Sequence, residues 1–155
     1  MGRVLQERLA TKRFEGPHHE AVLNVIVASS HLRGLLDAVF EGDGLTPGQY
    51  NVLRILNGAY PEGYPRGEIA RRMLDRAPDL TRMLDRLVRH GFVARARASQ
   101  DARQSIARIT PKGRKLLVSL HGRVHAVTRQ IEERLSAREA RDLSRLCEKL
   151  YGELD

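Results

Sequence analysis

The stretch that decides the fold runs from Pro78 to Gly113 and reads PDLTRMLDRLVRHGFVARARASQDARQSIARITPKG. In its first part, apolar residues recur at spacings of three and four, which predicts an amphipathic helix over residues 78–90. Gly91 follows directly, and glycine is a typical residue just past the C-terminal end of a helix. On a helical wheel the apolar residues share one arc, so the opposite, basic arc is expected to face solvent.

The second part of this stretch alternates between apolar and polar residues, which predicts strands over 92–97 and 104–109. The residues between the strands are small and polar, so the hairpin has a slim tip flanked by arginines. Thr110 and Pro111 then give a capping residue and a proline at the first helical position, which predicts a new helix. A basic helix followed by such a hairpin is the second half of a winged helix-turn-helix.

The residues on either side supply the remaining helices of such a fold. We expect helical segments at about 18–40, 46–56, 66–74 and 111–134, with residues 58–65 as a loop and 1–17 as a short helix or an arm. A final helix begins at a capping box formed by Ser136 and Glu139 and carries an apolar stripe. The fold class is therefore mainly α with a small β-hairpin wing.

The flanking helices are too apolar to be lone surface helices, which predicts a dimerisation region built from both ends of the chain. We expect three parts: an N-terminal arm and first dimerisation helix (1–44), a winged helix-turn-helix DNA-binding domain (45–110) and C-terminal dimerisation helices (111–155). No apolar run approaches the roughly 20 residues that cross a bilayer. We therefore expect a cytoplasmic protein with no membrane partner.

Charge is concentrated in one window of the chain. The protein has 155 residues and a formal net charge of +8. Residues 66–115 contain 14 Lys or Arg and 5 Asp or Glu, so this window carries the whole excess of positive charge. A concentrated basic segment is typical of proteins that bind polyanions, and the helix and hairpin lie inside it. Double-stranded DNA is the expected partner.

The start of the 78–90 helix and the hairpin are the expected DNA-contacting surfaces. The helix has the size and charge to enter a major groove, and the slim basic tip suits the minor groove, where arginine is favoured. Arg103 is the expected inserting side chain, and Asp101 is expected to brace it or to pair with Arg82 or Arg86. The full set of expected DNA-binding residues is Arg76, Pro78, Asp79, Thr81, Arg82, Arg86, Arg97, Ser99, Asp101 and Arg103.

Five short motifs in this order resemble the MarR family of winged-helix transcription regulators. They are Thr46-Pro-Gly-Gln, Arg66-Gly-Glu-Ile-Ala, Pro78-Asp-Leu-Thr-Arg-Met-Leu-Asp-Arg-Leu with His90-Gly-Phe-Val, Asp101-Ala-Arg103, and Ile109-Thr-Pro-Lys-Gly. The family usually has two arginines after the wing aspartate, or one two positions on; here Ala102 leaves only Arg103. The resemblance implies a homodimer, more often a repressor, on a pseudo-palindromic operator. It also implies release of DNA by a small aromatic or phenolic acid.

The sequence indicates an effector pocket only faintly. Polar groups on helices expected to converge near the hinge are His31, Tyr50, Arg54 and His121. An arginine with a tyrosine or histidine can hold a carboxylate. We expect no cofactor and no metal, and since no catalytic motif is present we expect no enzyme.

Two alternatives stay open at this point. The first is a zinc- or redox-gated regulator on the same scaffold, in which His121 and His125, four residues apart, or the single Cys147 act as the sensor. Cys147 lies on the apolar stripe of the last helix, however, which favours a packing role. The second alternative is a basic adaptor that binds an acidic protein and merely retains the winged fold.

Overall fold

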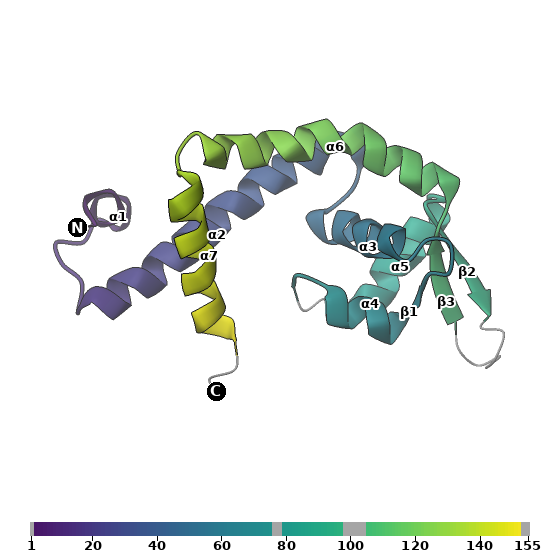
Figure 1. The fold of residues 1–155 in the computed structure, drawn as a ribbon, viewed down its shortest axis with the longest axis horizontal. Coiled ribbons are helices and arrows are strands. Elements are labelled where there is room, and N and C mark those ends of the chain that lie inside the picture. The colour runs from purple at the N-terminus through teal and green to yellow at the C-terminus, as the bar shows by residue number, and fades with distance from the viewer. Residues whose placement is uncertain (1, 76–78, 98–104, 153–155) are drawn as a thin grey trace. The chain divides into compact units, whose positions relative to one another are not determined.

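The computed structural model describes residues 2–75, 79–97 and 105–152 (Figure 1). The chain forms seven α-helices, one 3-10 turn and three strands in those residues. In order they are α1 (Arg3–Leu9), α2 (Pro17–Phe40), the 3-10 turn (Glu41–Asp43), α3 (Pro47–Gly58), β1 (Tyr64–Pro65), α4 (Arg66–Arg72), α5 (Leu80–Arg89), β2 (Val93–Arg97), β3 (Ser105–Ile109), α6 (Pro111–Glu132) and α7 (Ala137–Tyr151). This order confirms the mainly α fold with a hairpin wing.

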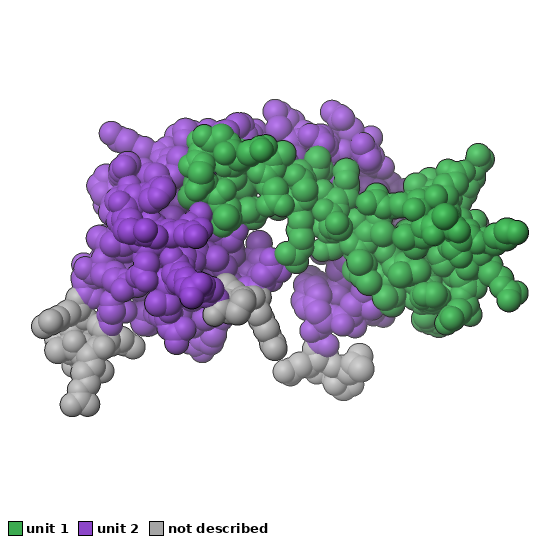
Figure 2. All heavy atoms as spheres, turned by 180° about the vertical axis from the view of Figure 1, so that it is seen from behind, with its two compact units in different colours: residues 1–47 green, residues 48–155 purple. Residues whose placement is uncertain are grey.

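The chain divides into two compact units, residues 1–47 and residues 48–155 (Figure 2). The first unit contains α1, α2 and the 3-10 turn, and the second contains the remaining helices and the sheet. The expected three-part organisation (1–44, 45–110 and 111–155) stays a prediction.

The sheet has three strands rather than the two that the hairpin predicted. Its order is β1-β3-β2, with both pairings antiparallel. β2 pairs with β3 from Val93 opposite Ile109 to Arg97 opposite Ser105, which confirms the hairpin. The added strand is the short β1, whose Tyr64 lies opposite Ala107, within the segment expected to be a loop. A two-residue strand containing a proline carries no alternation, so pairing on the edge of β3 makes it a strand.

The core of the second unit is aliphatic, as the scarcity of aromatic residues requires. It is formed by Val52, Leu53, Leu56, Ile69, Leu80, Leu84, Leu87, Val93, Ala107, Ile109, Leu117 and Leu120. These side chains come from α3, α4, α5, β2, β3 and the first half of α6, so α5 and the wing are held on one shared core. That core fixes the helix–wing geometry on which any DNA interface depends.

The starts of α6 and α7 use the predicted caps. The Thr110 hydroxyl accepts a hydrogen bond from the Gly113 N–H, and Pro111 occupies the first turn. At α7, the Ser136 hydroxyl and backbone N–H donate to the Glu139 carboxylate, and the Glu139 N–H donates to the Ser136 hydroxyl. The bonds from Ser136, chiefly that from its hydroxyl, lower the pKa of Glu139 below its ordinary value.

The flanking helices expose most of their apolar residues in the single chain. No residue of α7 is buried, and Leu146 and Leu150 are 52% and 67% exposed. In α2 only Phe40 is buried, and Ile26 is 59% exposed. Cys147, expected to be buried in packing, is only half-buried because the stripe around it has no cover within the chain.

The segment Pro17–Asp43 corrects the expectation that no apolar run is long enough to span a membrane. By length and composition alone this segment is long and apolar enough to cross a membrane, with a mean hydropathy of 1.3 over its most apolar window. His, Ser and Asn interrupt the apolar residues of this segment without lowering its mean hydropathy below that of a possible membrane span. The core helix of a soluble protein and an N-terminal signal sequence pass the same test, and Arg33 and Asp37 lie within this segment.

Candidate nucleic-acid interface

Helix α5 has the two faces that the sequence predicts. Leu80, Leu84 and Leu87 are buried in the core. Thr81, Arg82 and Arg86 are exposed, and Asp79 precedes the helix as its exposed N-cap residue. The helix spans Leu80–Arg89, slightly shorter than the predicted 78–90. It therefore presents a basic, polar surface that starts at its N-terminal end, where helices that enter a major groove meet base edges.

Asp79 contributes charge rather than a cap. Its side chain makes no capping hydrogen bond, and its carboxylate lies 3.3 Å from Arg82 Nε. Arg82 itself is 84% exposed at its side chain. A surface pair of this kind is weak, at about 1 kcal/mol or less, so Arg82 can exchange the carboxylate for a base or a phosphate at low cost.

An ion pair connects α5 to the wing. The Arg95 guanidinium on β2 donates to the Asp85 carboxylate over 2.7 Å, with both side chains about half exposed. The sequence predicted that Asp101 either braces Arg103 or pairs with Arg82 or Arg86 to hold the wing against this helix. Asp101 lies outside the described residues, so that prediction is untested. Asp85 and Arg95 are ten positions apart, and only the turn at Gly91 (φ +74°) brings them together. No local pattern signals that pairing.

We expect the Asp85–Arg95 pair to stabilise the helix–wing junction modestly. Asp85→Asn or Arg95→Gln should each lower the melting temperature by a few degrees, because an exposed ion pair contributes up to about 1 kcal/mol. The double variant should be no less stable than either single variant, since the second substitution has no interaction left to remove. Thermal unfolding of the four proteins measures this, and additive losses would contradict a direct interaction.

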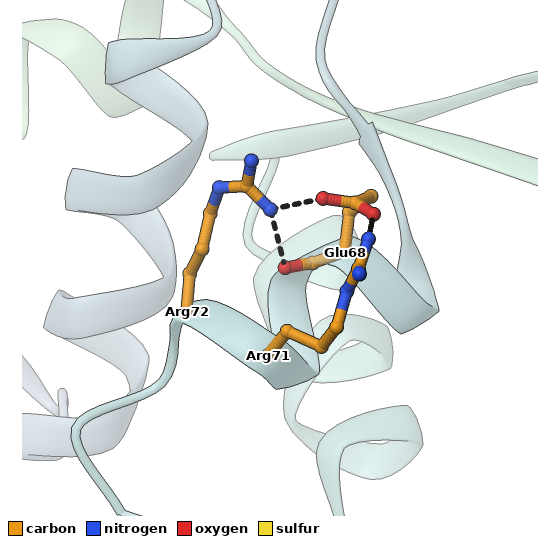
Figure 3. A network of polar contacts seen from close by, with 3 residues as sticks. All are labelled: Glu68, Arg71 and Arg72. Carbon is orange, nitrogen blue, oxygen red and sulfur yellow. Dashed lines mark hydrogen bonds and ion pairs between the residues drawn. The ribbon is translucent and has the colours of Figure 1, made fainter. Parts of the chain in front are cut away.

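Helix α4, the first of the two helix-turn-helix helices, carries a three-residue polar network (Figure 3). The Glu68 carboxylate pairs with Arg71 and with Arg72, and Arg72 also donates to the Glu68 carbonyl. The Arg72 guanidinium lies 4.4 Å from the centre of the Tyr64 ring. Glu68 thus offsets charge on two arginines of the basic window, which leaves α5 with the more available cations.

The connection between α4 and α5 is tied to α3. The backbone N–H of Leu74 donates to the Asn51 side-chain oxygen over 3.0 Å. Through this bond the Asn51 side chain holds the connection between α4 and α5 against α3. Of the other predicted DNA contacts, Arg97 belongs to β2 by its backbone. Arg76, Pro78, Ser99, Asp101 and Arg103 lie outside the described residues.

The base of the wing is fastened to the end of α5 and the start of α6. The Thr110 hydroxyl donates to the Gly91 carbonyl over 2.7 Å, and the Lys112 ammonium donates to the His90 carbonyl over 2.8 Å. The Thr110 N–H donates to the Phe92 carbonyl over 2.9 Å. These contacts explain why the Thr-Pro-Lys-Gly motif follows the hairpin: the Thr110 and Lys112 side chains fasten the end of α5 to the start of α6, and the Thr110 backbone binds the residue before β2.

A pocket of about 700 Å³ lies between α3 and α6 in the second unit. Its lining residues are Arg54, Asn57, Pro111, Arg114, Lys115, Leu117, Val118 and His121. Arg54 and His121 were predicted as effector residues, and the structure brings these two together. Tyr50 is half-buried on α3 and does not line this pocket, and His31 lies on α2 in the other unit.

The sequence prediction missed the other cations of this pocket. Arg114 and Lys115 were counted only in the basic window, although both lie about two helical turns before His121 on α6. The run Pro-Lys-Gly-Arg-Lys at the start of α6 was the available signal. Among the residues that the structure describes, no group of three His, Cys, Asp or Glu side chains is placed to hold a metal ion. The His121 and His125 rings lie 6.0 Å apart on α6.

Comparisons with known proteins agree with this architecture. A profile of the MarR family matches residues 45–105. The HTH-type transcriptional repressor YetL of Bacillus subtilis (strain 168) is 29% identical over 95 residues, which are 61% of this chain and 57% of the repressor. The chain thus matches just over half the length of this curated relative.

Solved structures match over nearly their whole length. A MarR transcription factor from Planctomyces limnophilus is 34% identical, with a TM-score of 0.68 over 88% of this chain and 98% of that one. A variant of MarR from E. coli, complexed with operator DNA, is 25% identical, with a TM-score of 0.74 over 82% of this chain and 90% of that one. The helix order, the wing and this level of identity lead to one assignment: the chain belongs to the MarR family of winged-helix transcription regulators.

Proposed function

We propose that this protein is a dimeric, sequence-specific DNA-binding regulator, most simply a repressor, that works in the cytoplasm. The observation that carries the proposal is the exposed face of α5, with Thr81, Arg82 and Arg86 beside a basic wing on a shared core. In the proposed complex, α5 enters the major groove of a pseudo-palindromic operator and the wing lies along the flanking minor groove. The similar MarR variant from E. coli was solved with operator DNA, and YetL is a repressor by name.

The second copy of the chain is the proposed cover for the apolar faces of α2 and α7. Leu143, Leu146 and Leu150 recur at helical spacing and are all at least half exposed. Exposed stripes of this kind are stable in water only when another surface buries them. A dimer also presents two α5 helices to the two half-sites of a palindrome, which a monomer does not.

The proposed function includes a response to a small-molecule effector. The pocket between α3 and α6 has a volume within the usual range for small-ligand sites, about 300–1,000 Å³. Its residue Pro111 begins the helix that follows the wing, and Thr110 and Lys112 bind the end of α5. A ligand that shifts the start of α6 therefore acts on the junction that positions both DNA-contacting elements.

Fluorescence anisotropy on short duplexes tests the proposal. The DNA upstream of the gene that encodes this protein is cut into short overlapping duplexes. Binding to each duplex is compared with binding to a scrambled duplex at two salt concentrations. One fragment should bind at least about 1,000-fold more tightly than the scrambled control. Affinity for every duplex should fall steeply with salt, because phosphate contacts release counterions. Equal binding to many genomic fragments and to acidic polypeptides would instead favour a basic adaptor.

Replacing Arg82 is expected to separate charge from base recognition. Arg82→Ala should weaken binding to the preferred duplex by about 5- to 150-fold, the usual 1–3 kcal/mol for a bidentate base contact. Arg82→Lys keeps the charge but loses the two-pronged geometry, so it should bind scrambled DNA like the unmodified protein and lose preference for the operator. Anisotropy with both duplexes measures this. Equal losses of affinity for the two duplexes would mean that Arg82 contacts phosphate and not bases.

A further inference from the structure

The pocket between α3 and α6 has an unusual charge composition. Arg54 and Asn57 reach it from α3, and the other six lining residues come from the first half of α6. Three of the eight lining side chains are permanently cationic (Arg54, Arg114 and Lys115) and one is a histidine. None of the eight is acidic. A concave surface lined by one sign of charge concentrates the field and favours ions of the opposite sign.

These cations lack acidic partners among the described residues. In that part of the chain no carboxylate forms an ion pair with Arg54, Arg114 or Lys115. Among the described residues, the contacts of Arg114 are with neutral groups: its Nε donates to the Asn57 side-chain oxygen over 3.2 Å, and its guanidinium lies 4.2 Å from the Tyr60 ring centre. These contacts orient the Arg114 guanidinium but leave its charge uncompensated. On α4, by contrast, one glutamate offsets two arginines.

The pocket also has an apolar part and a favourable helix end. Leu117 is buried at 8% exposure, and Val118 is 78% exposed, so both offer apolar surface to an occupant. Pro111 lies at the first position of the 22-residue α6, whose N-terminal end carries partial positive charge. Oxyanions are favoured beside the cations and the helix end, while a carbon skeleton is favoured against Leu117 and Val118.

We propose that this pocket binds a small organic polyanion, a compound with at least two anionic groups on an apolar body. A single carboxylate would leave at least two of the three permanent cations close together without a counter-charge, whereas two or three anionic groups balance them. The pocket lies near the C-terminal end of β3, where the chain continues into α6. The connection between β2 and β3 is at the other end of that strand. In the proposed regulator such a compound is the effector, and in that respect this inference rests on the proposed function.

A graded series of acids tests the ligand class on the full-length protein without DNA. Benzoate, benzene-1,3-dicarboxylate and benzene-1,3,5-tricarboxylate share one ring and differ in charge. Isothermal titration calorimetry at pH 7 and constant ionic strength should give a Kd that falls about two- to fivefold with each added carboxylate. Equal affinity for the three acids, or no measurable heat with the tricarboxylate at millimolar concentration, overturns the proposal. Because no DNA is present, failure here is distinct from failure of DNA binding.

Charge-matched variants locate the binding. Arg54→Gln and Lys115→Gln should each remove most of the advantage of the tricarboxylate over benzoate, while Arg141→Gln on α7 removes one charge elsewhere and should preserve it. Circular dichroism confirms that each variant is folded. Unchanged acid binding in both pocket variants places the acids elsewhere and overturns the assignment. A loss of binding to scrambled duplex in the two pocket variants, without loss of acid binding, assigns the cations to DNA instead.

Discussion

The double variant Leu146→Glu, Leu150→Glu is expected to be monomeric and to bind its operator at least 100-fold more weakly than the unmodified protein. Both leucines lie on the exposed stripe of α7, and burying a leucine side chain stabilises by about 1.5–3 kcal/mol. In a twofold-symmetric dimer each substitution occurs twice, and each also brings a charge into an apolar interface. The loss therefore exceeds what a dimer of micromolar or nanomolar affinity can tolerate.

The effect on DNA follows from the loss of the second half-site. A dimer binds two half-sites as one linked event, so dissociation removes the benefit of effective concentration. Light scattering coupled to size-exclusion chromatography should change from twice the chain mass to the single-chain mass of 17.5 kDa. Arg141→Gln with Lys149→Gln lowers the net charge of α7 by the same two units and leaves the stripe intact, so it should remain dimeric. A double glutamate variant that stays dimeric would exclude α7 from the interface.

Sedimentation with lipid vesicles addresses the apolar segment Pro17–Asp43. If its surface is buried between two copies, the unmodified protein stays in the supernatant after ultracentrifugation with lipid vesicles. Its exposed apolar residues, among them Val22, Val25 and Ile26, would then belong to a helical interface rather than to a lipid-facing surface. Length and average hydropathy do not distinguish a helical interface from a lipid-facing surface, because apolar residues are favourable in both.

Features that depend on neighbouring residues were predictable from the sequence. The apolar arc of α5 follows from a repeat within ten residues, and the buried Leu80, Leu84 and Leu87 confirm it. The caps at Thr110 and Ser136 act over three residues, and their hydrogen bonds are present as predicted. Capping and amphipathic periodicity are local consequences of helix geometry, so composition and spacing are sufficient to predict them.

Features that depend on chain reversal were not predictable. Strand β1 exists because Tyr64 and Pro65 pair with Ala107 and Ile106, more than forty residues away. The Asp85–Arg95 pair requires the turn at Gly91, and the pocket requires α3 and α6 to lie side by side. Arg54, Arg114 and Lys115 each look like an ordinary surface cation in sequence, and only the fold shows that they share one pocket. Distance in space, not residue type, is the missing information.

Gly113→Ala is expected to lower the free energy of unfolding by about 2–4 kcal/mol and the melting temperature by roughly 10 °C. Gly113 is buried where the first turn of α6 packs against the base of the wing. A Cβ atom at this position would overlap the Phe92 carbonyl oxygen and would lie 2.8 Å from Ile109 Cγ1. Real Cβ atoms almost never approach backbone so closely. The Phe92 carbonyl also already accepts a hydrogen bond from the Thr110 N–H, so swinging aside would break that bond.

Movement of Phe92 to make room for the added methyl group would disturb the junction between α5, the wing and α6. The Phe92 carbonyl already accepts from the Thr110 N–H, and Thr110 also binds the Gly91 carbonyl, so moving Phe92 breaks contacts between α5, the wing and α6. We therefore expect DNA affinity to fall even at temperatures where the variant is still folded. Gly122→Ala is the matched control on the same helix, because a Cβ atom there meets nothing within 4 Å. Alanine should stabilise that position by up to about 1 kcal/mol.

Thermal unfolding of the two variants discriminates between tight packing at Gly113 and a general sensitivity of α6 to glycine replacement. Opposite shifts, a large decrease for Gly113→Ala and a small increase for Gly122→Ala, assign the effect to the overlap with Phe92. A decrease of similar size in both would mean that α6 tolerates no added side chain at either glycine. A Gly113→Ala protein as stable as the unmodified chain would mean that the base of the wing moves away from α6 at little cost. The Thr-Pro-Lys-Gly junction would then not be the rigid connection between the wing and the helix that carries the effector pocket.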